Sequence, residues 1–164
     1  RGWEPYEQFP AGQWEKEVAV GLSSAHYATQ AVAPIMMKQK KGSIINVSST
    51  TGITASNHAK YPEGRFKSPA YGTVKTGLLG LTRAWASYFS AAGAPDVRVN
   101  AICFGAVNFK EITPELLEKL KGRNMLGRAA RPDEYHGAMI FLASDASAFM
   151  TAQTLIIDGG QTAW

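Results

Sequence analysis

Apolar positions along the chain follow two different spacings. Short apolar runs typical of buried strands occur at residues 43–47, 97–102 and 154–157. Residues 14–38 and 70–90 instead carry apolar side chains every three to four positions, which is the spacing of an amphipathic helix. The strands alternate with the helices, and each strand is too apolar to face water on either side. This pattern predicts an α/β fold with a doubly wound parallel sheet that helices cover on both faces.

Proline, glycine and capping residues set the expected boundaries of these elements. Ser68 followed by Pro69 is a typical helix start, with serine as the N-cap and proline in the first turn. Pro34 is expected to kink or end the first helix, and residues 1–13 are expected to form an ordered loop. The remaining expected elements are a short helix at residues 113–122, a helix from Pro132 and a turn at residues 158–160.

The size and composition of the chain fit one domain. Its 164 residues, 45% of them hydrophobic, are enough for a single core, so residues 1–164 are predicted to form a single domain. No apolar run approaches the length of a membrane span, and the first residues do not resemble a signal peptide. Cys103 is the only cysteine, which excludes an intramolecular disulfide, and no Cys/His cluster indicates a metal site. We therefore expect a cytoplasmic protein with no membrane partner and no metal.

The net charge of +4 raises the question of a nucleic-acid partner. Its basic residues are scattered along the chain and form no basic block. A mildly basic surface accounts for the charge more simply, so no nucleic-acid partner is expected.

Residues able to carry chemistry gather at the end of the first predicted strand and the start of the second long helix. Ser48 and Ser49 end the strand, and only one of them can face a site, because successive strand residues point to opposite faces. Tyr71 and Lys75 are four residues apart and therefore share one face of a helix. A hydroxyl beside such a pair can take part in acid–base chemistry. The structural alternative is an amphipathic helix with a tyrosine at the edge of the core and a solvated lysine.

The pattern Ser49…Tyr71-x-x-x-Lys75 resembles the catalytic signature of the short-chain dehydrogenase/reductase family. Further similar pieces follow in the family's order: Arg98-Val99-Asn100-Ala101-Ile102, Gly127-Arg128, Phe141-Leu142-Ala143-Ser144-Asp145 and Asp158-Gly159-Gly160. The resemblance covers most of the chain from Trp14 onward. It implies a Rossmann-like sheet, of which this chain is the C-terminal portion, and an enzyme that acts on CH–OH groups.

The resemblance also implies a role for each of these residues. Tyr71 is expected to be the acid/base, while Lys75 lowers the pKa of Tyr71 and binds the nicotinamide ribose. The family's active serine is followed three positions later by glycine, so Gly52 selects Ser49 over Ser48 as the hydroxyl that polarises the substrate oxygen. An ammonium about 4 Å from the phenol, at an effective dielectric near 20, contributes roughly 4 kcal/mol, or about three pKa units. Lys75 is therefore sufficient to activate Tyr71 in a dry site.

Cofactor contacts are implied by the same resemblance. Gly105 and Val107 join Tyr71 and Lys75 as expected cofactor-binding residues, because Phe104-Gly105-Ala106-Val107 is similar to a family turn whose backbone contacts the nicotinamide carboxamide. An ordinary strand-ending turn is the alternative for this stretch. The implied cofactor is NAD or NADP. The sequence contains no G-x-G-x-x-G turn, so we expect the cofactor-cradling half of the family to be absent and the chain to hold a dinucleotide poorly by itself.

Several positions depart from the family pattern. Gly21 stands where the family has a proton-relay asparagine, Phe104 replaces a proline, and Phe109 stands where a threonine is common. Tyr71 follows Ser49 by 22 residues, a longer interval than the family's usual one, which predicts a surface insertion between them. These departures leave the relay in question and favour reduced or altered activity.

The sequence as a whole predicts an NAD(P)-dependent oxidoreductase that interconverts a secondary alcohol and a ketone by hydride transfer. Gly21 and the missing nucleotide-binding half favour an alternative, which is a protein of the same fold that binds or regulates without turnover.

Both long helices carry apolar residues beyond a single stripe, which indicates a second packing partner. These residues include Tyr27, Ile35, Leu79 and Phe89. Family members commonly pair the corresponding helices between subunits, so a homodimer or homotetramer is expected.

The insertion at residues 57–67 is the feature most particular to this sequence. It carries Lys60, Arg65 and Lys67 against Glu63, a net charge of +2. Its two ends are tied to the candidate site, beyond the carboxyl ends of the strands, where ligands bind in open α/β sheets. We expect the loop to help close the substrate pocket and to favour polar or anionic substrates. A plain surface loop is the alternative.

Overall fold

The computed structural model describes residues 3–108, 114, 118 and 122–163. In this part of the chain, a parallel sheet has the strand order β1-β2-β3. The strands are β1 (Gly42–Ser49), β2 (Val97–Phe104) and β3 (Thr154–Ile157), close to the ranges expected from the sequence. Phe109 and most of the helix predicted for residues 113–122 lie outside the described residues.

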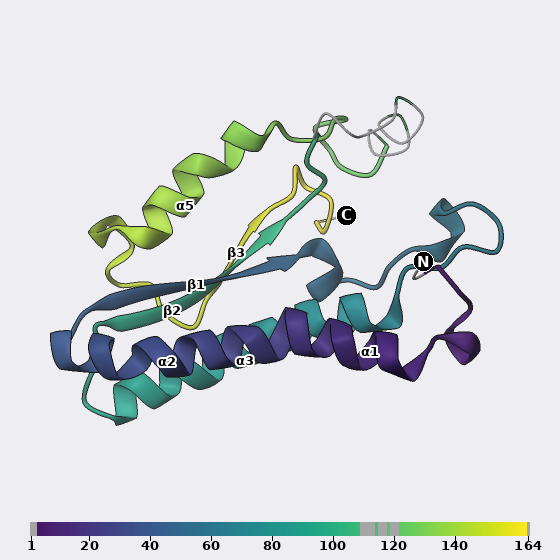
Figure 1. Ribbon diagram of the computed structural model, residues 1–164. Coiled ribbons are helices and arrows are strands. Elements are labelled where there is room, and N and C mark those ends of the chain that lie inside the picture. The colour runs from purple at the N-terminus through teal and green to yellow at the C-terminus, as the bar shows by residue number, and fades with distance from the viewer. Residues whose placement is uncertain (1–2, 109–113, 115–117, 119–121, 164) are drawn as a thin grey trace.

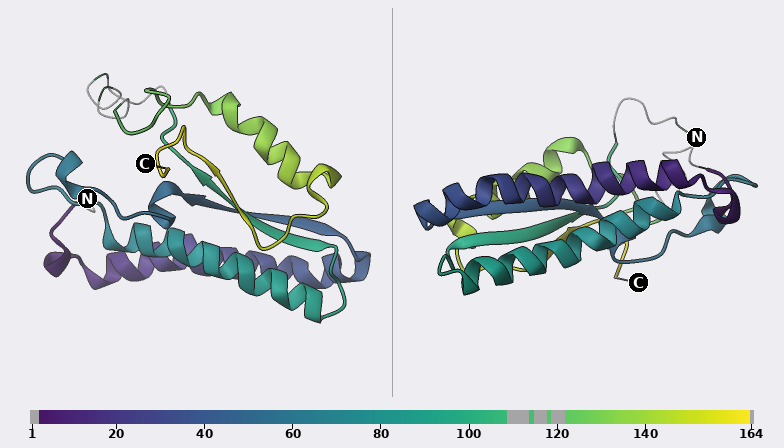
Figure 2. Two further views of the ribbon diagram at one scale, coloured as in Figure 1. Left: turned by 180° about the vertical axis from the view of Figure 1, so that it is seen from behind. Right: turned by 60° about the horizontal axis from the view of Figure 1, so that its bottom comes forward.

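The helices lie on both faces of this sheet. Figures 1 and 2 show α1 (Ala11–Val18) and α2 (Ser24–Gln39) end to end as one long helix, which lies beside α3 (Pro69–Ala91) along one face. The other face carries α5 (His136–Ala143). A parallel sheet with helices on both faces confirms the predicted α/β class. That residues 1–164 form a single domain stays a prediction.

The first long helix starts earlier than predicted and continues through Pro34. It begins at Ala11, directly after Pro10, and a short 3₁₀ turn at Tyr6–Gln8 lies within the segment expected to be loop. Of the two outcomes expected at Pro34, a kink or an end, the end is excluded, because α2 continues to Gln39. Ala33 is buried, and the methionines that follow Pro34 pack against the core. This packing offsets the loss of the hydrogen bond that proline cannot donate.

Apolar spacing in the sequence predicts one buried stripe on α3, and the observed stripe is rotated from it. The predicted stripe consists of Tyr71, Val74, Leu78, Leu81, Trp85 and Tyr88. The buried residues are Ala70, Val74, Leu78, Thr82, Ala86 and Phe89. Phe89 is fully buried, so its place on an outward face was wrong, whereas Tyr88 is exposed. Thr82 is buried because its hydroxyl donates to Leu78 O and accepts from Asn46 Nδ2 of β1, at 2.7 and 2.9 Å. A satisfied polar pair therefore occupies a core position that apolar spacing did not indicate.

The core centres on β2, whose residues are buried from Val97 to Cys103. Phe89 packs there with Ala33, Ala86, Val97 and Val99, and full burial of a phenylalanine contributes roughly 1.5–3 kcal/mol. The core lies along the middle strand. Polar side chains can therefore lie together at the carboxyl ends of the strands, outside this core.

Ser68 and Pro69 start α3 as predicted. The Ser68 hydroxyl accepts from Tyr71 N at 3.4 Å and donates to Glu17 Oε2 at 2.7 Å, which fastens the start of α3 to α1. Tyr71 and Lys75 consequently lie in the first two turns of a helix whose N-terminus is held in place.

Candidate active site

Ser48 and Ser49 occupy different environments at the end of β1. The hydroxyl of Ser48 is buried and donates to Lys75 O on α3 at 2.7 Å. The hydroxyl of Ser49 is half-buried and accepts from Thr51 N at 3.4 Å, in the 3₁₀ turn Thr50–Gly52. Ser48 is thus committed to packing the strand on the helix, and Ser49 is the serine left at the rim of the sheet.

The turn after Ser49 lies against the start of α3. Thr76 Oγ1 donates to Gly52 O at 3.1 Å, and a β-carbon at Gly72 would lie 3.7 Å from Thr51 O. The fold therefore brings the end of β1 and the face that carries Tyr71 and Lys75 to one end of the molecule.

Two lysines flank Tyr71. Lys75 Nζ lies 5.7 Å from the centre of the Tyr71 ring, and Lys67 Nζ lies closer, at 4.2 Å. Lys75 Nζ also donates to Val47 O of β1 at 2.9 Å. Burial lowers the pKa of Lys75, while Cys103 acts in the opposite direction. Sequence reasoning placed Lys67 in the insertion but did not foresee its contact with Tyr71, since that contact depends on how the loop folds back.

A cavity of about 280 Å³ opens beside Tyr71 and Lys75. The other walls are Val74 of α3 and five residues of α1 and the π-helical turn Ala19–Ser23, namely Gln13, Lys16, Glu17, Val20 and Gly21. π-Helical turns inside longer helices occur frequently at functional sites. The size and the mixed polar and apolar lining suit a small organic molecule.

Gly21 has a steric reason at this turn. A β-carbon there would lie 2.5 Å from Cγ1 of Val74, which is buried on α3. Any side chain at this position, asparagine included, would displace Val74. The departure from the family's asparagine thus goes with close packing of the two helices.

Gly105 lies at the carboxyl end of β2, where Phe104 pairs in register with Ser49. A β-carbon at Gly105 would lie 2.7 Å from Asp158 Cα, and Gly105 N donates to Ile157 O at 2.9 Å. Glycine is therefore needed for the approach of β2 to the end of β3. The Phe104 ring packs against that of Tyr135, tilted by 48° with 4.3 Å between ring centres, which gives the aromatic residue a packing role in place of proline.

Val107 follows this turn and forms a parallel bridge with Ala130. Asn108 N donates to Ala130 O at 2.7 Å, and Ala130 N donates to Ala106 O at 2.9 Å. The turn from Gly105 to Val107 is thus held from both sides at the same edge of the sheet as Ser49.

Asp158, Gly159 and Gly160 form the turn expected from the sequence. Both glycines have positive φ, and the Asp158 carboxylate accepts from Gly160 N and Thr162 N at 2.9 and 2.8 Å. The carboxylate is therefore engaged by its own turn.

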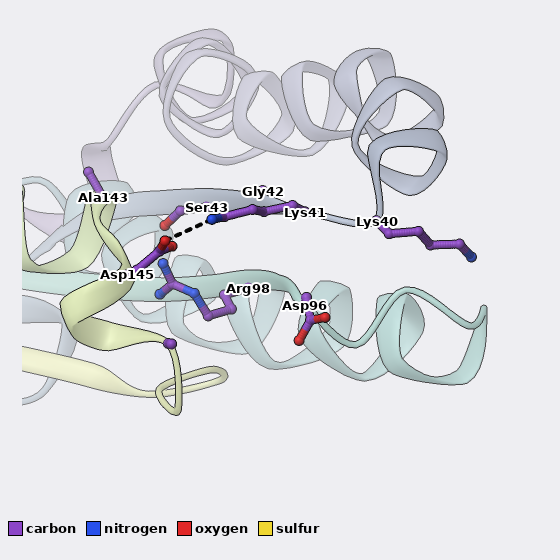
Figure 3. Close-up of a pocket in the computed structure, with 9 residues that line it drawn as sticks. Lys40, Lys41, Gly42, Ser43, Asp96, Arg98, Ala143 and Asp145 are labelled. Atoms are coloured by element: carbon purple, nitrogen blue, oxygen red, sulfur yellow. Dashed lines mark hydrogen bonds and ion pairs between the residues drawn. The ribbon is translucent and has the colours of Figure 1, made fainter.

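A larger cavity, of about 450 Å³, lies at the opposite end of the strands (Figure 3). Lys41 pairs there with Asp145 at 2.8 Å, and Arg98 is buried and donates to carbonyl oxygens and to Ser147 Oγ. Ser43 Oγ donates to Leu142 O at 2.7 Å. These groups join α5 to the sheet, so this end of the molecule is structural.

The described residues contain neither a membrane-spanning helix nor a cluster of metal ligands. None of the described helices is long and apolar enough to cross a membrane. Over the same residues, no group of three or more His, Cys, Asp or Glu side chains is arranged to hold a metal ion.

Comparison with known proteins places this chain among dehydrogenases and reductases. A family model described as enoyl-(acyl carrier protein) reductase matches residues 2–162. The probable galactose dehydrogenase GalD of Rhizobium meliloti is 38% identical over 152 residues, which are 90% of this chain and 55% of that protein. The 3-oxoacyl-[acyl-carrier-protein] reductase FabG of Thermotoga maritima is 36% identical over 151 residues, 90% of this chain and 56% of the relative. The chain thus spans about half the length of these curated relatives.

Solved structures agree with these relatives. A short-chain dehydrogenase from Leptospira borgpetersenii with bound NAD⁺ superposes with a TM-score of 0.86 at 26% identity, over 98% of this chain and 60% of that one. A gluconate 5-dehydrogenase from Burkholderia cenocepacia in complex with NADP and tartrate gives a TM-score of 0.86 at 27% identity, over 99% and 61% of the two chains. The chain therefore belongs to the short-chain dehydrogenase/reductase family.

Proposed function

We propose that the protein is an NAD(P)-dependent oxidoreductase that interconverts a secondary alcohol and a ketone. The observation that carries this proposal is the position of Tyr71, whose ring centre has two ammonium groups near it, at 4.2 and 5.7 Å. Alcohol oxidation needs a base for the hydroxyl proton, and a phenolate beside two cations is such a base. The cavity along Tyr71 and Lys75 offers room for the substrate.

Each residue has a separate task in this proposal. Tyr71 takes the proton from the alcohol oxygen, or returns it to the ketone, and the lysine charges stabilise its phenolate form. Ser49 donates a hydrogen bond to the same substrate oxygen and orients it. Ser48 holds β1 against α3, since its hydroxyl is bonded to the Lys75 carbonyl.

The residues present fit the nicotinamide end of a dinucleotide. Lys75 offers an ammonium at the cavity that Tyr71 lines, and Gly105 and Val107 lie at the neighbouring strand end. When bound, the nicotinamide supplies the hydride acceptor or donor. Structural neighbours described with NAD⁺, NADP and NADH support a nicotinamide cofactor for the full-length protein. The sequence has no G-x-G-x-x-G turn, so this chain offers no such cradle for the pyrophosphate.

The names of the relatives support the reaction class rather than one substrate. They are described as acting on galactose, 3-oxoacyl carrier protein and 2-keto-3-deoxy-L-fuconate. These molecules share a carbinol or ketone carbon, and little else. The proposal is accordingly limited to small-molecule alcohols and ketones, and we expect the enzyme to act in the cytoplasm.

A binding or regulatory protein without turnover is the second candidate. It is favoured by Gly21 in the asparagine position and by Lys75 Nζ, which is bonded to Val47 O. Turnover of any secondary alcohol by the full-length protein would exclude this second candidate.

The test is replacement of Tyr71 by phenylalanine in the full-length protein. Cofactor reduction would be followed by absorbance with a panel of secondary alcohols, together with the Kd for NAD⁺ and NADP⁺. We expect kcat to fall by roughly 10²–10⁴-fold with little change in cofactor affinity, the usual contribution of acid–base catalysis. A loss of less than tenfold would contradict the role of Tyr71.

We also propose that the protein is a homo-oligomer, either a homodimer or a homotetramer. On α2, Tyr27 and Ile35 are 63% and 60% exposed, and on α3 Tyr88 is 51% exposed. Leu79 is half-buried. Exposed apolar side chains on neighbouring helices commonly mark interfaces.

A further inference from the structure

The insertion between β1 and α3 is packed against the first described residues of the chain. Phe66 N donates to Trp3 O at 3.0 Å, and the Tyr6 hydroxyl lies 3.2 Å from His58 Nε2. The rings of Trp3 and Tyr61 lie 5.4 Å apart between centres. Figure 1 shows this loop beside the N-terminus, at the end of the molecule toward which β1 points. The loop is therefore held in one place beside the candidate site.

Lys67 is the residue through which this loop reaches Tyr71. Its ammonium lies 4.2 Å from the centre of the Tyr71 ring and 5.9 Å from the centre of a Trp3 ring. Burial lowers the pKa of Lys67, and Glu17 acts in the opposite direction. The ion pairs that join described residues do not include Lys67. A cation with aromatic neighbours and lost hydration gains more from an anionic ligand than a fully hydrated surface lysine does.

Glu17 does not fill the place of such a ligand. Its two carboxylate oxygens accept hydrogen bonds from Gln13 Nε2 at 2.9 Å and from Ser68 Oγ at 2.7 Å. It acts on Lys67 through its charge rather than through a direct ion pair. The three donor hydrogens of the Lys67 ammonium therefore retain capacity for a ligand.

Arg123, from a distant part of the sequence, approaches Tyr61 of the insertion. Its guanidinium carbon lies 5.7 Å from the centre of the Tyr61 ring. Its Nε atom is buried and has no hydrogen-bond partner among the described residues. A buried donor without a partner is costly, and an anion that accepts from it would remove that cost.

We propose that Lys67, together with Arg123 beside Tyr61, forms an anion site that selects substrates carrying a carboxylate near the reacting carbinol. This inference rests on the proposed function, because it assigns a substrate class to the same site. The substrate class is a short hydroxy acid and the corresponding oxo acid. Arginine and lysine are the side chains that bind carboxylates most directly, arginine through two parallel N–H groups.

The geometry limits the length of the hydroxy acid that the site can bind. The Lys67 ammonium lies over the Tyr71 ring, 4.2 Å from the ring centre, and the Tyr71 hydroxyl is attached to the same ring. A molecule whose carbinol oxygen contacts the Tyr71 hydroxyl therefore places a carboxylate at Lys67 only if few carbons separate the two groups. The Trp3 and Tyr61 rings can cover the apolar part of such a molecule.

The rest of the insertion contributes differently from Lys67. Arg65 is exposed, and the side chain of Lys60 lies outside the described part of the structure. The sequence hypothesis of an anion-selective loop is therefore tested here on Lys67. Arg65 has the same charge, lies on the same loop and serves as the control.

The test uses matched pairs of an acid and its amide: lactate and lactamide, 3-hydroxybutyrate and 3-hydroxybutyramide, 4-hydroxypentanoate and its amide. Binding of each to the full-length protein with cofactor would be measured by ligand-detected NMR, which does not require turnover. We expect at least one acid to bind roughly tenfold to a hundredfold more tightly than its amide, the range of a charged hydrogen bond. Lys67→Gln should bring this ratio close to one, and Arg123→Gln should reduce it, whereas Arg65→Gln should leave it unchanged.

The outcomes separate this inference from the proposed function. If the parent protein oxidises secondary alcohols but binds no acid more tightly than its amide, the anion site is wrong and the reaction class stands. Equal ratios in parent and Lys67→Gln would also overturn it. If inorganic phosphate binds in a manner that depends on Lys67 and none of the acids does, the carboxylate assignment is wrong. Lys67→Arg keeps the charge and should keep the selectivity, which a merely structural role would not require.

Discussion

The hydroxyl of Ser48 donates a hydrogen bond to the main-chain carbonyl of Lys75, 2.7 Å away. One bond thus joins the strand that ends in Ser49 to the helix that presents Tyr71 and Lys75. The neighbouring serines of β1 are therefore chemically alike but differ in task, one structural and one at the site.

Replacing each serine by alanine should separate these tasks. Ser48→Ala should lower the free energy of unfolding by about 0.5–1.5 kcal/mol, the typical net value of one hydrogen bond. Ser49→Ala should leave stability nearly unchanged and reduce kcat/KM for alcohol oxidation. Urea unfolding and steady-state kinetics on the two variants check this. A loss of stability confined to Ser49→Ala would mean that the two serines are assigned the wrong way round.

Gly21→Ala should destabilise the protein, although alanine is the better helix former. The added methyl group would lie 2.5 Å from Val74 Cγ1, and overpacking of a filled site costs about 1–3 kcal/mol, against a helix-propensity gain of up to about 1 kcal/mol.

Gly80→Ala is the matched control, because Gly80 lies in α3 with nothing within 4 Å of its β-carbon position. It should be stabilising by about 0.5–1 kcal/mol. Thermal unfolding measures both variants, and a stabilised Gly21→Ala would contradict the close packing of the two helices.

Stability at low pH should depend on Glu134. Hydrogen bonds from Arg128, at 2.6 and 2.7 Å, and from Arg131 N lower the pKa of Glu134 from 4.5 to about 2. The folded protein therefore keeps this carboxylate charged at pH values where the unfolded chain takes up the proton. Its contribution is fully present above pH 4.5 and is lost as the pH falls toward 2.

The comparison is between parent and Glu134→Gln. The difference in Tm should be constant from neutral pH down to about 5 and should shrink as the pH falls through the range between the two pKa values. Glu63→Gln, on the exposed insertion, serves as the control and should show no such trend. A difference that persists unchanged at pH 2 would exclude the ion pair as its source.

The exposed side chains of α2 and α3 predict the outcome of an assembly experiment. Ile35→Lys combined with Tyr88→Glu should reduce the oligomer to monomers at micromolar concentration, because charges would replace apolar residues at the proposed interface. Light scattering on the full-length protein checks the mass. A parent protein that is already a monomer would refute the oligomer.

The sequence predicted the strands well and the helices less well, for reasons that particular residues show. The strand ranges followed from continuous apolar runs, and the start of α3 followed from the Ser68–Pro69 cap. The buried stripe of α3 was misplaced because the Thr82 hydroxyl is satisfied inside the protein by Leu78 O and Asn46. Apolar spacing contains no information about such partners.

The candidate site was likewise predicted in part. Ser49, Tyr71 and Lys75 lie at one end of the molecule, as local spacing and the family resemblance had indicated, while their catalytic roles stay predictions. The contact of Lys67 with Tyr71 was not predicted, because it depends on the insertion folding back against Trp3. A loop whose position is set by contacts with a distant segment has no periodicity from which that position can be deduced.

Arg98 has a consequence for how the C-terminal third of the molecule opens. Its guanidinium donates to Leu142 O, Ser144 O and Ser147 Oγ, three acceptors within six residues at the end of α5. Neighbouring Asn100 bonds to Met150 O and accepts from Gln153 N, just before β3. Separating α5 from the sheet, or β3 from β2, would break bonds to the same stretch of β2. The end of α5 and β3 should therefore lose their amide protection together in hydrogen exchange, as one cooperative unit.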